Sequence, residues 1–583
     1  MIRRLLLVLP SAALLLCATP AVLGATTTAS AGATTLYAYA AGGATSPTSC
    51  PRTTTKSQEC TLAAALSLAK AGESVALATP GKAGHYVGNW SVTTSGTSSS
   101  APLTIKPAPG VTNPTLDGNH GKPAGCQTKA CDGPVLTIGS KVHVDISGLT
   151  IQNGDNTVNV LYGYGGAIQN DAGGTLSVSA CMFSKNTATD GGAIDNADKY
   201  GTGTVTVSRS TFTANSATGA GGTQDGGAID NADNGGTGSL TVSGSTFTAN
   251  TATVSSGNSN DGGAIDNADN GGTGSLTVSG STFSGNSVGV LRGSYAGGGG
   301  AIDNTDNGGK GIFSVSDSTF SGNSAHYGGA VAHNAGTGTV SDSTFSGNLA
   351  GYGGAICNGW GGSGTLSVSG STFSANRADA LGGAIDNGND PGSGFSSTLS
   401  VSASTFFGDS ATGNSNAPDS FPGGTSGLAV GYGGAIDNEH TGTLAISGST
   451  FSADTAKNGG GAMNNFDLVW AAADIFNGPC NVADGVTWKD EGYNVGKDAS
   501  CLKAGTGDVS HGAGLLGSLA HNGGPTETMM PLAGNPAIGV VPLNTNVKLN
   551  GRSVKLCPTI DQRGVHSAAG KACNAGAVQS SAS

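Results

Sequence analysis

The amino-acid sequence predicts an all-β solenoid, a parallel β-helix, and three observations carry this prediction. A Gly-Gly-Ala triplet begins at ten places between Gly165 and Gly460. A second phrase, such as LSVSGSTFSANRA, recurs between the triplets and brings one phenylalanine each time. The tightest copies place Phe320 and Phe345 only 25 residues apart. Self-similarity at a period of about 20 to 50 residues is typical of stacked repeats.

One repeat, residues 364–387, shows why its elements are strands. Leu366 and Val368 alternate with serines, which is the period of a half-buried strand. Phe373 then points inward on a second short strand, and Asn376 ends that strand. The glycine pair that follows turns the chain into a third strand. Glycine pairs and β-branched runs oppose helices, so we expect three short strands and three corners in each coil.

Stacking such coils about 4.8 Å apart places identical residues on top of one another. We therefore expect phenylalanine stacked on phenylalanine, and asparagine amides hydrogen-bonded from coil to coil. An asparagine lies three residues after most of the phenylalanines: Asn186, Asn215, Asn250, Asn286, Asn323, Asn348 and Asn376. Asp409 and Asp454 replace it in the last two copies. We interpret this column as structural.

The composition bears on both folding and partners. Of 583 residues, 101 are glycine and 11 % are charged, a balance that indicates disorder in a chain without periodicity. The recurring apolar positions predict a folded rod instead. A net charge of −12 disfavours nucleic acid and anionic membranes as partners.

The first residues predict export. Arg3 and Arg4 precede an apolar run, residues 5–16, and small residues follow, as in a signal peptide over 1–31. No later segment is long and apolar enough to span a membrane. We therefore expect a secreted, extracellular protein.

Cysteine spacing favours local disulfides in an exported chain. The pairs we expect are Cys50–Cys60, Cys126–Cys131, Cys480–Cys501 and Cys557–Cys573. Cys181 and Cys357 replace repeat residues and are expected to be free thiols. A zinc site is the alternative, but the chain lacks paired CxxC spacing.

Four insertions distinguish some repeats from others. They follow Phe212, Phe247, Phe283 and Phe406, and all enter between the phenylalanine and the next Gly-Gly-Ala. We expect them on one edge of the rod, where per-repeat insertions often form a binding face; harmless loop drift is the alternative. The binding-surface candidates are Leu291, Arg292, Tyr295 and Trp360. Trp360 either stacks on a sugar or packs as a turn aromatic.

An acidic column accompanies the Gly-Gly-Ala triplets. Strand alternation places an outward aspartate between Ile and Asn at Asp195, Asp230, Asp266, Asp303, Asp386 and Asp437. Some copies add a second acid three residues later. Like charges one strand apart repel unless water screens them or a cation bridges them. The calcium candidates are Asp230, Asp233, Asp266, Asp269, Asp303 and Asp306; the alternative is a solvated acidic face.

The repeat resembles that of the chlamydial polymorphic outer-membrane proteins. Phe320-Ser321-Gly322-Asn323 followed by Gly328-Gly329-Ala330-Val331 carries the likeness, which covers about residues 160–466. Those proteins are surface β-helices implicated in adhesion, so the resemblance implies the same fold and a role in binding.

The two ends resemble secreted bacterial right-handed β-helix proteins with a choice-of-anchor Q domain. Cys60-Thr61-Leu62 looks like their capping start, with Thr61 as helix N-cap, and Asp561-Gln562-Arg563-Gly564 matches their C-terminal module. The resemblance implies a pectate-lyase-like right-handed solenoid with an N-terminal capping helix and a C-terminal capping module. We divide the chain into signal peptide 1–31, N-terminal cap and first coils 32–140, repeats 141–466 and C-terminal module 467–583.

The acids do not gather at one coil beside a base, as a lyase or hydrolase would need. We therefore assign no catalytic residue and no certain cofactor. The expected function is binding or adhesion to glycans or cell-surface components. The alternatives are a polysaccharide lyase or glycoside hydrolase acting on acidic polysaccharide, and a passive structural rod. The oligomeric state stays open.

Overall fold

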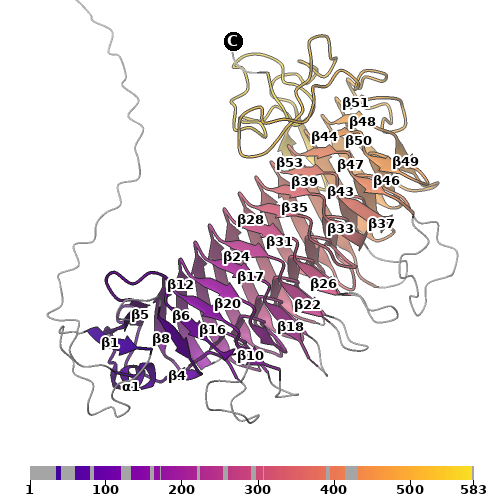
Figure 1. The fold of residues 1–583 in the computed structure, drawn as a ribbon. Helices are drawn as coiled ribbons and strands as arrows, with labels where there is room; N and C mark the ends of the chain where they lie inside the picture. The colour runs from indigo at the N-terminus through magenta and orange to yellow at the C-terminus, as the bar shows by residue number, and fades with distance from the viewer. Residues whose placement is uncertain are drawn as a thin grey trace, which may run out of the picture.

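The structure is a computed structural model in which the chain forms one elongated rod (Figure 1). The first strands lie at one end of the rod and the C-terminal residues at the other. The structure describes residues 35–40, 60–78, 84–119, 133–157, 163–170, 172–197, 199–219, 224–253, 260–289, 297–305, 308–388, 394–413 and 431–580.

Three long parallel sheets run the length of the rod and confirm the predicted parallel β-helix. The first sheet has 15 strands, the second 14 and the third 13. One coil passes from β16 (Thr202–Ser208) in the first sheet to β17 (Thr211–Thr213) in the second and later to β19 (Ile229–Asn231) in the third. Neighbouring strands within these three sheets pair in parallel, as in β16 with β20 (Thr237–Ser243).

Some coils carry a fourth short strand between the second and third sheets. These strands form a five-stranded sheet, β10-β14-β18-β22-β26, and a four-stranded sheet, β33-β37-β41-β45. The members used below are β18 (Ser216–Thr218), β22 (Thr251–Thr253), β26 (Ser287–Gly289) and β41 (Ser410–Ala411). The coil of β28 (Lys310–Ser316), β29 (Thr319–Ser321) and β30 (Val331–His333) lacks this strand and has the predicted three.

Columns of identical residues fill the core. The phenylalanine rings from Phe183 to Phe451 stack face to face, with neighbouring centroids 4.6–4.9 Å apart. The isoleucines of the third sheet stack likewise, as Ile229 pairs with Ile265. Both columns are fully buried, and the predicted stacking is confirmed.

The asparagines form two hydrogen-bond ladders, of which the second is interrupted between His333 and Asn358. In the first, Nδ2 of Asn250 donates to Oδ1 of Asn286 at 2.9 Å and to the carbonyl of Phe212 at 3.1 Å. In the second, Nδ2 of Asn231 donates to Oδ1 of Asn267 at 2.7 Å. His333 takes one place in the second ladder, where its Nδ1 lies 3.0 Å from Nδ2 of Asn304. The amides thus satisfy buried backbone and side-chain groups together.

The Gly-Gly pairs are required by backbone geometry. Gly226 has φ +62°, in the left-handed region that glycine enters without strain. At Gly227 an added Cβ would collide with the carbonyl oxygen of Gly263 in the next coil. Glycine at both positions lets successive coils approach closely.

A short helix covers the first coil, as expected. Helix α1 (Leu62–Leu68) begins after Thr61, whose hydroxyl accepts a hydrogen bond from the backbone N–H of Ala64 at 3.2 Å. Its apolar residues, Leu62 and Leu66 among them, belong to the main core. The helix ends at Leu68, and Ala69 is its C-cap.

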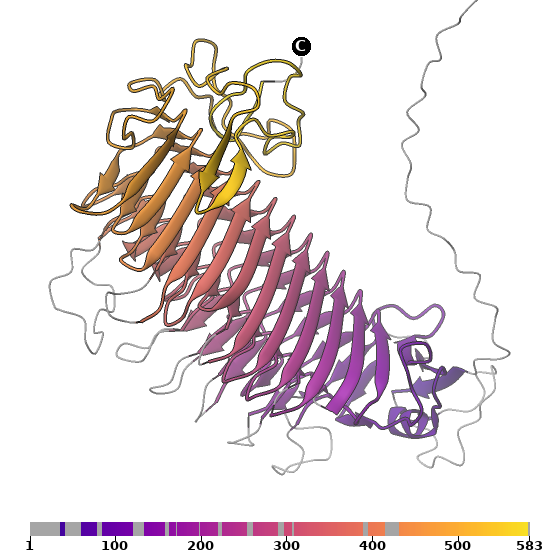
Figure 2. The same ribbon diagram turned by 180° about the vertical axis from the view of Figure 1, so that it is seen from behind.

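The chain beyond the last strands of the long sheets, β50 (Trp488–Gly492) and β51 (Val495–Gly496), folds back along the rod. Gln562 is 2 % exposed and reaches the second sheet, where its Nε2 donates to the carbonyl of Ser371 and its Oε1 accepts from the Thr405 hydroxyl. The hairpin of β52 (Asn546–Leu549) and β53 (Arg552–Lys555) lies beside the last strands of the first sheet (Figure 2).

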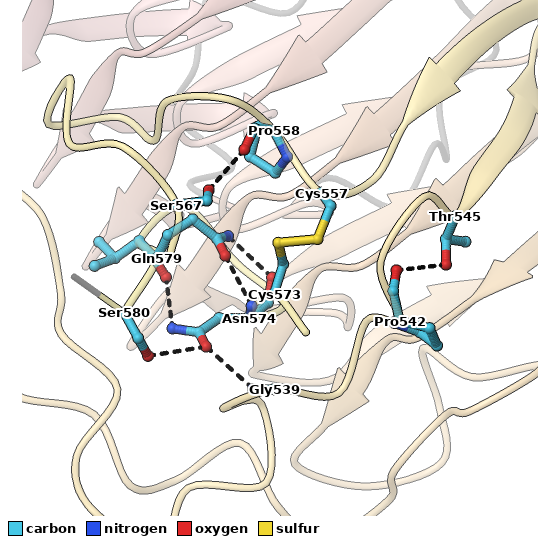
Figure 3. The surroundings of a disulfide bond; sticks show 11 residues. Gly539, Pro542, Thr545, Cys557, Pro558, Ser567, Cys573, Asn574, Gln579 and Ser580 are labelled. Atoms are coloured by element: carbon cyan, nitrogen blue, oxygen red, sulfur yellow. Dashed lines mark hydrogen bonds between the residues drawn. A yellow bond between two sulfur atoms is a disulfide. The ribbon is translucent and has the colours of Figure 1, made fainter. Parts of the chain in front are cut away.

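Two of the predicted disulfides, Cys480–Cys501 and Cys557–Cys573, are confirmed, and Cys181 and Cys357 are free and buried. The second disulfide lies beside Asn574, whose backbone N–H donates to Oε1 of Gln579 at 2.8 Å (Figure 3). The pairs Cys50–Cys60 and Cys126–Cys131 include residues outside the described ranges.

Candidate functional site

The acidic column of the third sheet is buried, and the expectation that it faces solvent is wrong. Asp230 pairs in register with Asp266, and Asp266 with Asp303 of β27 (Ile302–Asn304). The whole column is 0 % exposed: Asp195, Asp230, Asp266, Asp303, Asp386 and Asp437. A solvated acidic face is therefore excluded for these six residues.

Two flanking segments carry acids that lie close to the buried column. One is the residue before each Gly-Gly pair, such as Asp261; the other is the loop after each Asn, such as Asp269. Both of these carboxylates act electrostatically on Asp266, which lies between them on β23 (Ile265–Asn267). Strand alternation predicted the direction of Asp266 correctly but not what lies above it.

The acids before the Gly-Gly pairs form a ladder of their own, which the sequence analysis did not identify. Oδ1 of Asp190 accepts from the backbone N–H of Asp225 at 3.3 Å, and Oδ1 of Asp225 accepts from that of Asp261 at 3.1 Å. Oδ1 of Asp261 accepts from the N–H of Gly298 at 2.7 Å. The signal was present in the sequence, since an aspartate precedes the glycine pair in three successive copies.

Three of these carboxylates converge, and the carboxylate of Asp266 interacts electrostatically with two of them, so we name Asp225, Asp233, Asp266 and Asp269 the acidic cluster. Asp225, Asp233 and Asp269 each offer one carboxylate oxygen, and these oxygens lie within 4.8 Å of one another. Both oxygens of Asp266 are buried and accept no hydrogen bond from the described residues, and the same holds for Oδ2 of Asp225. Of the calcium candidates, the structure thus joins Asp233, Asp266 and Asp269, adds Asp225, and leaves Asp230 and Asp303 beside them in the column.

Burial governs the charge of this cluster. It raises the pKa of Asp225 well above the ordinary value, and the neighbouring Asp269, Asp233 and Asp266 raise it further. Burial also raises the pKa of Asp266, and among the neighbouring carboxylates Asp269 raises it most. For Asp233 the pKa rise from burial is opposed by hydrogen bonds from Asn270 and Asn234. The cluster therefore resists holding its full negative charge without a compensating partner.

A second buried acidic group lies farther along the column. Asp386, Asp437 and Glu439 offer carboxylate oxygens within 4.8 Å of one another. Oδ1 of Asp437 accepts from Nδ2 of Asn464 at 2.5 Å, and burial raises the pKa of Asp437 to about 7. Glu439 was not a candidate from the sequence, because only one copy of the repeat carries an acid directly after the Ile-Asp-Asn strand.

Aromatic rings occupy the coils where the acidic column breaks. Ala332 and Cys357 replace aspartate there, and Tyr327 and Tyr352 replace the acid before the Gly-Gly pair. The Trp360 ring stacks on Tyr327, with centroids 4.5 Å apart, and on Tyr352 at 5.6 Å. Trp360 is half-buried, which agrees with a packed turn aromatic.

The insertions leave the rod from one line of residues, which we name the insertion edge: Thr218, Thr253 and Gly289. These residues end β18, β22 and β26 and pair with one another in register. The fourth insertion follows β41, in the second short sheet. The common attachment is as expected, while Asp306 and the binding candidates Leu291, Arg292 and Tyr295 lie outside the described residues.

Comparisons with known proteins found one repeat family and several solved structures to which the chain is similar. Residues 342–359 match the repeat of the Chlamydia polymorphic membrane proteins. No curated protein matches the chain. The PL6 family alginate lyase AlyGC and a point mutant of it resemble the chain at 12 % identity and a TM-score of 0.34, over 81 % of this chain and 54 % of theirs. The chain thus spans about half the length of those lyases, and the likeness concerns the fold alone.

Proposed function

We propose that this chain is a secreted β-helix protein that binds glycans or other cell-surface components along its insertion edge. The observation that carries the proposal is the in-register alignment of Thr218, Thr253 and Gly289, from which three successive insertions depart. Insertions gathered on one face of a solenoid commonly form its binding surface.

The geometry of the edge favours a partner that is itself repetitive. Paired residues in successive coils lie about 4.8 Å apart, so the points where the insertions attach recur at a constant spacing along the rod. A partner built from repeated units can contact several insertions at once, and several weak contacts then add up to a useful affinity. Glycans have this repetitive character.

Secretion is proposed from two features. The first residues read as a signal peptide, with Arg3 and Arg4 before an apolar run. The disulfides Cys480–Cys501 and Cys557–Cys573 belong to a chain that matures in an oxidising compartment. The C-terminal module, similar to the choice-of-anchor Q domain, docks on the rod through Gln562 and serves in this proposal as its cap. Among the described residues, no helix is long and apolar enough to cross a bilayer.

The enzymatic alternative receives no support from the acids of the column. A lyase or hydrolase must bring its carboxylates or its ion to the polymer. The column carboxylates, Asp266 for example, are 0 % exposed and closed off by the flanking segments. A polysaccharide cannot reach them without unfolding the coils.

The test compares the intact protein with a variant in which residues 414–430 are replaced by a two-residue linker, on glycan arrays and on cells. A matched control carries Thr241→Ala and Thr277→Ala, which alter exposed positions of the first sheet instead. We expect the replacement to weaken binding on the order of tenfold, as loss of one of several contacts would, and the control to bind normally. Blank arrays with folded protein would support the passive rod, and release of products from alginate or pectin would support the enzyme; either result refutes the proposal.

A further inference from the structure

We propose that the acidic cluster, Asp225, Asp233, Asp266 and Asp269, binds one calcium ion inside the rod. The four carboxylates come from two neighbouring coils. Asp225 and Asp233 flank β19, while Asp266 and Asp269 lie on and just after β23. A cation held among them would join the two coils on the side from which the insertions depart.

The unsatisfied oxygens point to a missing ligand. Asp266 is 0 % exposed, and neither of its carboxylate oxygens accepts a hydrogen bond from the described residues. Oδ2 of Asp225 is also buried and accepts no hydrogen bond from the described residues. Buried polar atoms in folded proteins nearly always have a partner, and these three oxygens all belong to the cluster. A cation would satisfy them together.

The ligand set selects the ion. Calcium binds oxygen ligands at about 2.3–2.6 Å, so two ligands on opposite sides of one ion lie about 4.8 Å apart. The oxygens of Asp225, Asp233 and Asp269 lie within 4.8 Å of one another, so one calcium ion can contact all three. Magnesium dehydrates reluctantly and usually keeps several waters beside one or two carboxylates, which does not suit a buried site made of four carboxylates. Carboxylates without histidine or cysteine are a poor set for zinc.

The placement gives the site a structural consequence. Asp225 follows the first of the three successive insertions, with only Gln224 between it and residues outside the described ranges. An ion at Asp225 and Asp269 would hold the returning end of that insertion against the next coil. We therefore expect calcium to stabilise the coils at the insertion edge.

The experiment uses the full chain, treated with a chelator and then titrated with calcium chloride by calorimetry, with thermal unfolding measured in parallel. Asp266→Asn and Asp269→Asn keep the side-chain shapes and remove one charge each. The matched control is Asp454→Asn, which neutralises a buried aspartate of the first ladder, outside the cluster. We expect a saturable calcium site and a calcium-dependent rise in Tm. We expect each cluster variant to weaken that site on the order of tenfold or more and the control to leave it intact.

Three results would overturn the inference. The first is equal calcium stoichiometry and affinity in the wild type and in the Asp266→Asn/Asp269→Asn double variant, which would place any bound ion elsewhere. The second is magnesium binding as tightly as calcium, which would contradict the choice of ion. The third is no effect of calcium or chelator on Tm, which would show that no ion joins the two coils.

Discussion

Replacing Asp409 by asparagine should stabilise the protein, and the gain should grow with pH. Asp409 occupies the first ladder, where the preceding copies carry asparagine. Its Oδ1 accepts from both the backbone N–H and Nδ2 of Asn376 at 2.8 Å. Its Oδ2 is buried and makes no hydrogen bond with the described residues. An asparagine would place a donor at that position, as Asn376 does toward the carbonyl of Phe345 at 3.1 Å.

The magnitude follows from the pKa of the Asp409 carboxyl, which burial raises from 3.8 to about 7. An acid with a raised pKa in the fold keeps its proton there while the unfolded chain loses its own, so stability falls as pH rises from 3.8 to about 7. Each pKa unit corresponds to about 1.4 kcal/mol. Between about pH 5 and pH 8 the wild type should lose about 3 kcal/mol through this group, and Asp409→Asn should not.

The assay is chemical denaturation at both pH values, monitored by the fluorescence of buried tryptophans such as Trp470. The reverse substitution, Asn376→Asp, is the matched control and should destabilise the rod more at the higher pH. Identical pH slopes for the wild type and Asp409→Asn, or an Asn376→Asp variant as stable as the wild type at the higher pH, would refute the reasoning.

Two further substitutions test the core and the C-terminal module. Phe283→Ala removes a fully buried ring stacked at 4.8 Å on both Phe247 and Phe320. We expect the free energy of unfolding to fall by about 3–5 kcal/mol. A fall of less than about 1 kcal/mol would show that the coils close over the gap. Gln562→Ala leaves the Thr405 hydroxyl without its acceptor and removes the hydrogen bond to the Ser371 carbonyl. We expect the free energy of unfolding to fall by about 1–3 kcal/mol and proteases to cleave faster after residue 496 while the coils stay intact. An unchanged digestion pattern would mean that other contacts hold the module.

Particular residues show how far the sequence alone could reach. The Phe283 stack and the Asn250 ladder were predictable because a residue repeated at every coil must meet its own copy in a parallel sheet. The Thr61 cap and the Cys480–Cys501 pair were predictable because both depend on residues close in sequence. The short fourth strands, β22 for example, were not predicted, since two or three residues carry no readable period.

The acidic column marks the limit of that reasoning. Alternation correctly turns Asp266 away from the core, yet it carries no information on whether another segment covers the outer face. The fold brings Asp225 close to Asp233 and Asp269, and burial together with Asp269, Asp230, Asp303 and Asp261 raises the pKa of Asp266. The calcium candidates from the sequence included Asp233, Asp266 and Asp269 but not Asp225, and calcium binding stays a prediction.

The sequence by itself determined the coil, its strands and the columns that run through the core, because a fixed period makes the neighbour of every inward residue its own copy. Only the tertiary structure decided which outward residues are sealed and where the C-terminal module docks. Gln562 meets Ser371 across 191 residues, and Asp266 is covered by segments without an apolar pattern. Such contacts depend on the path of loops in space, which no local period encodes.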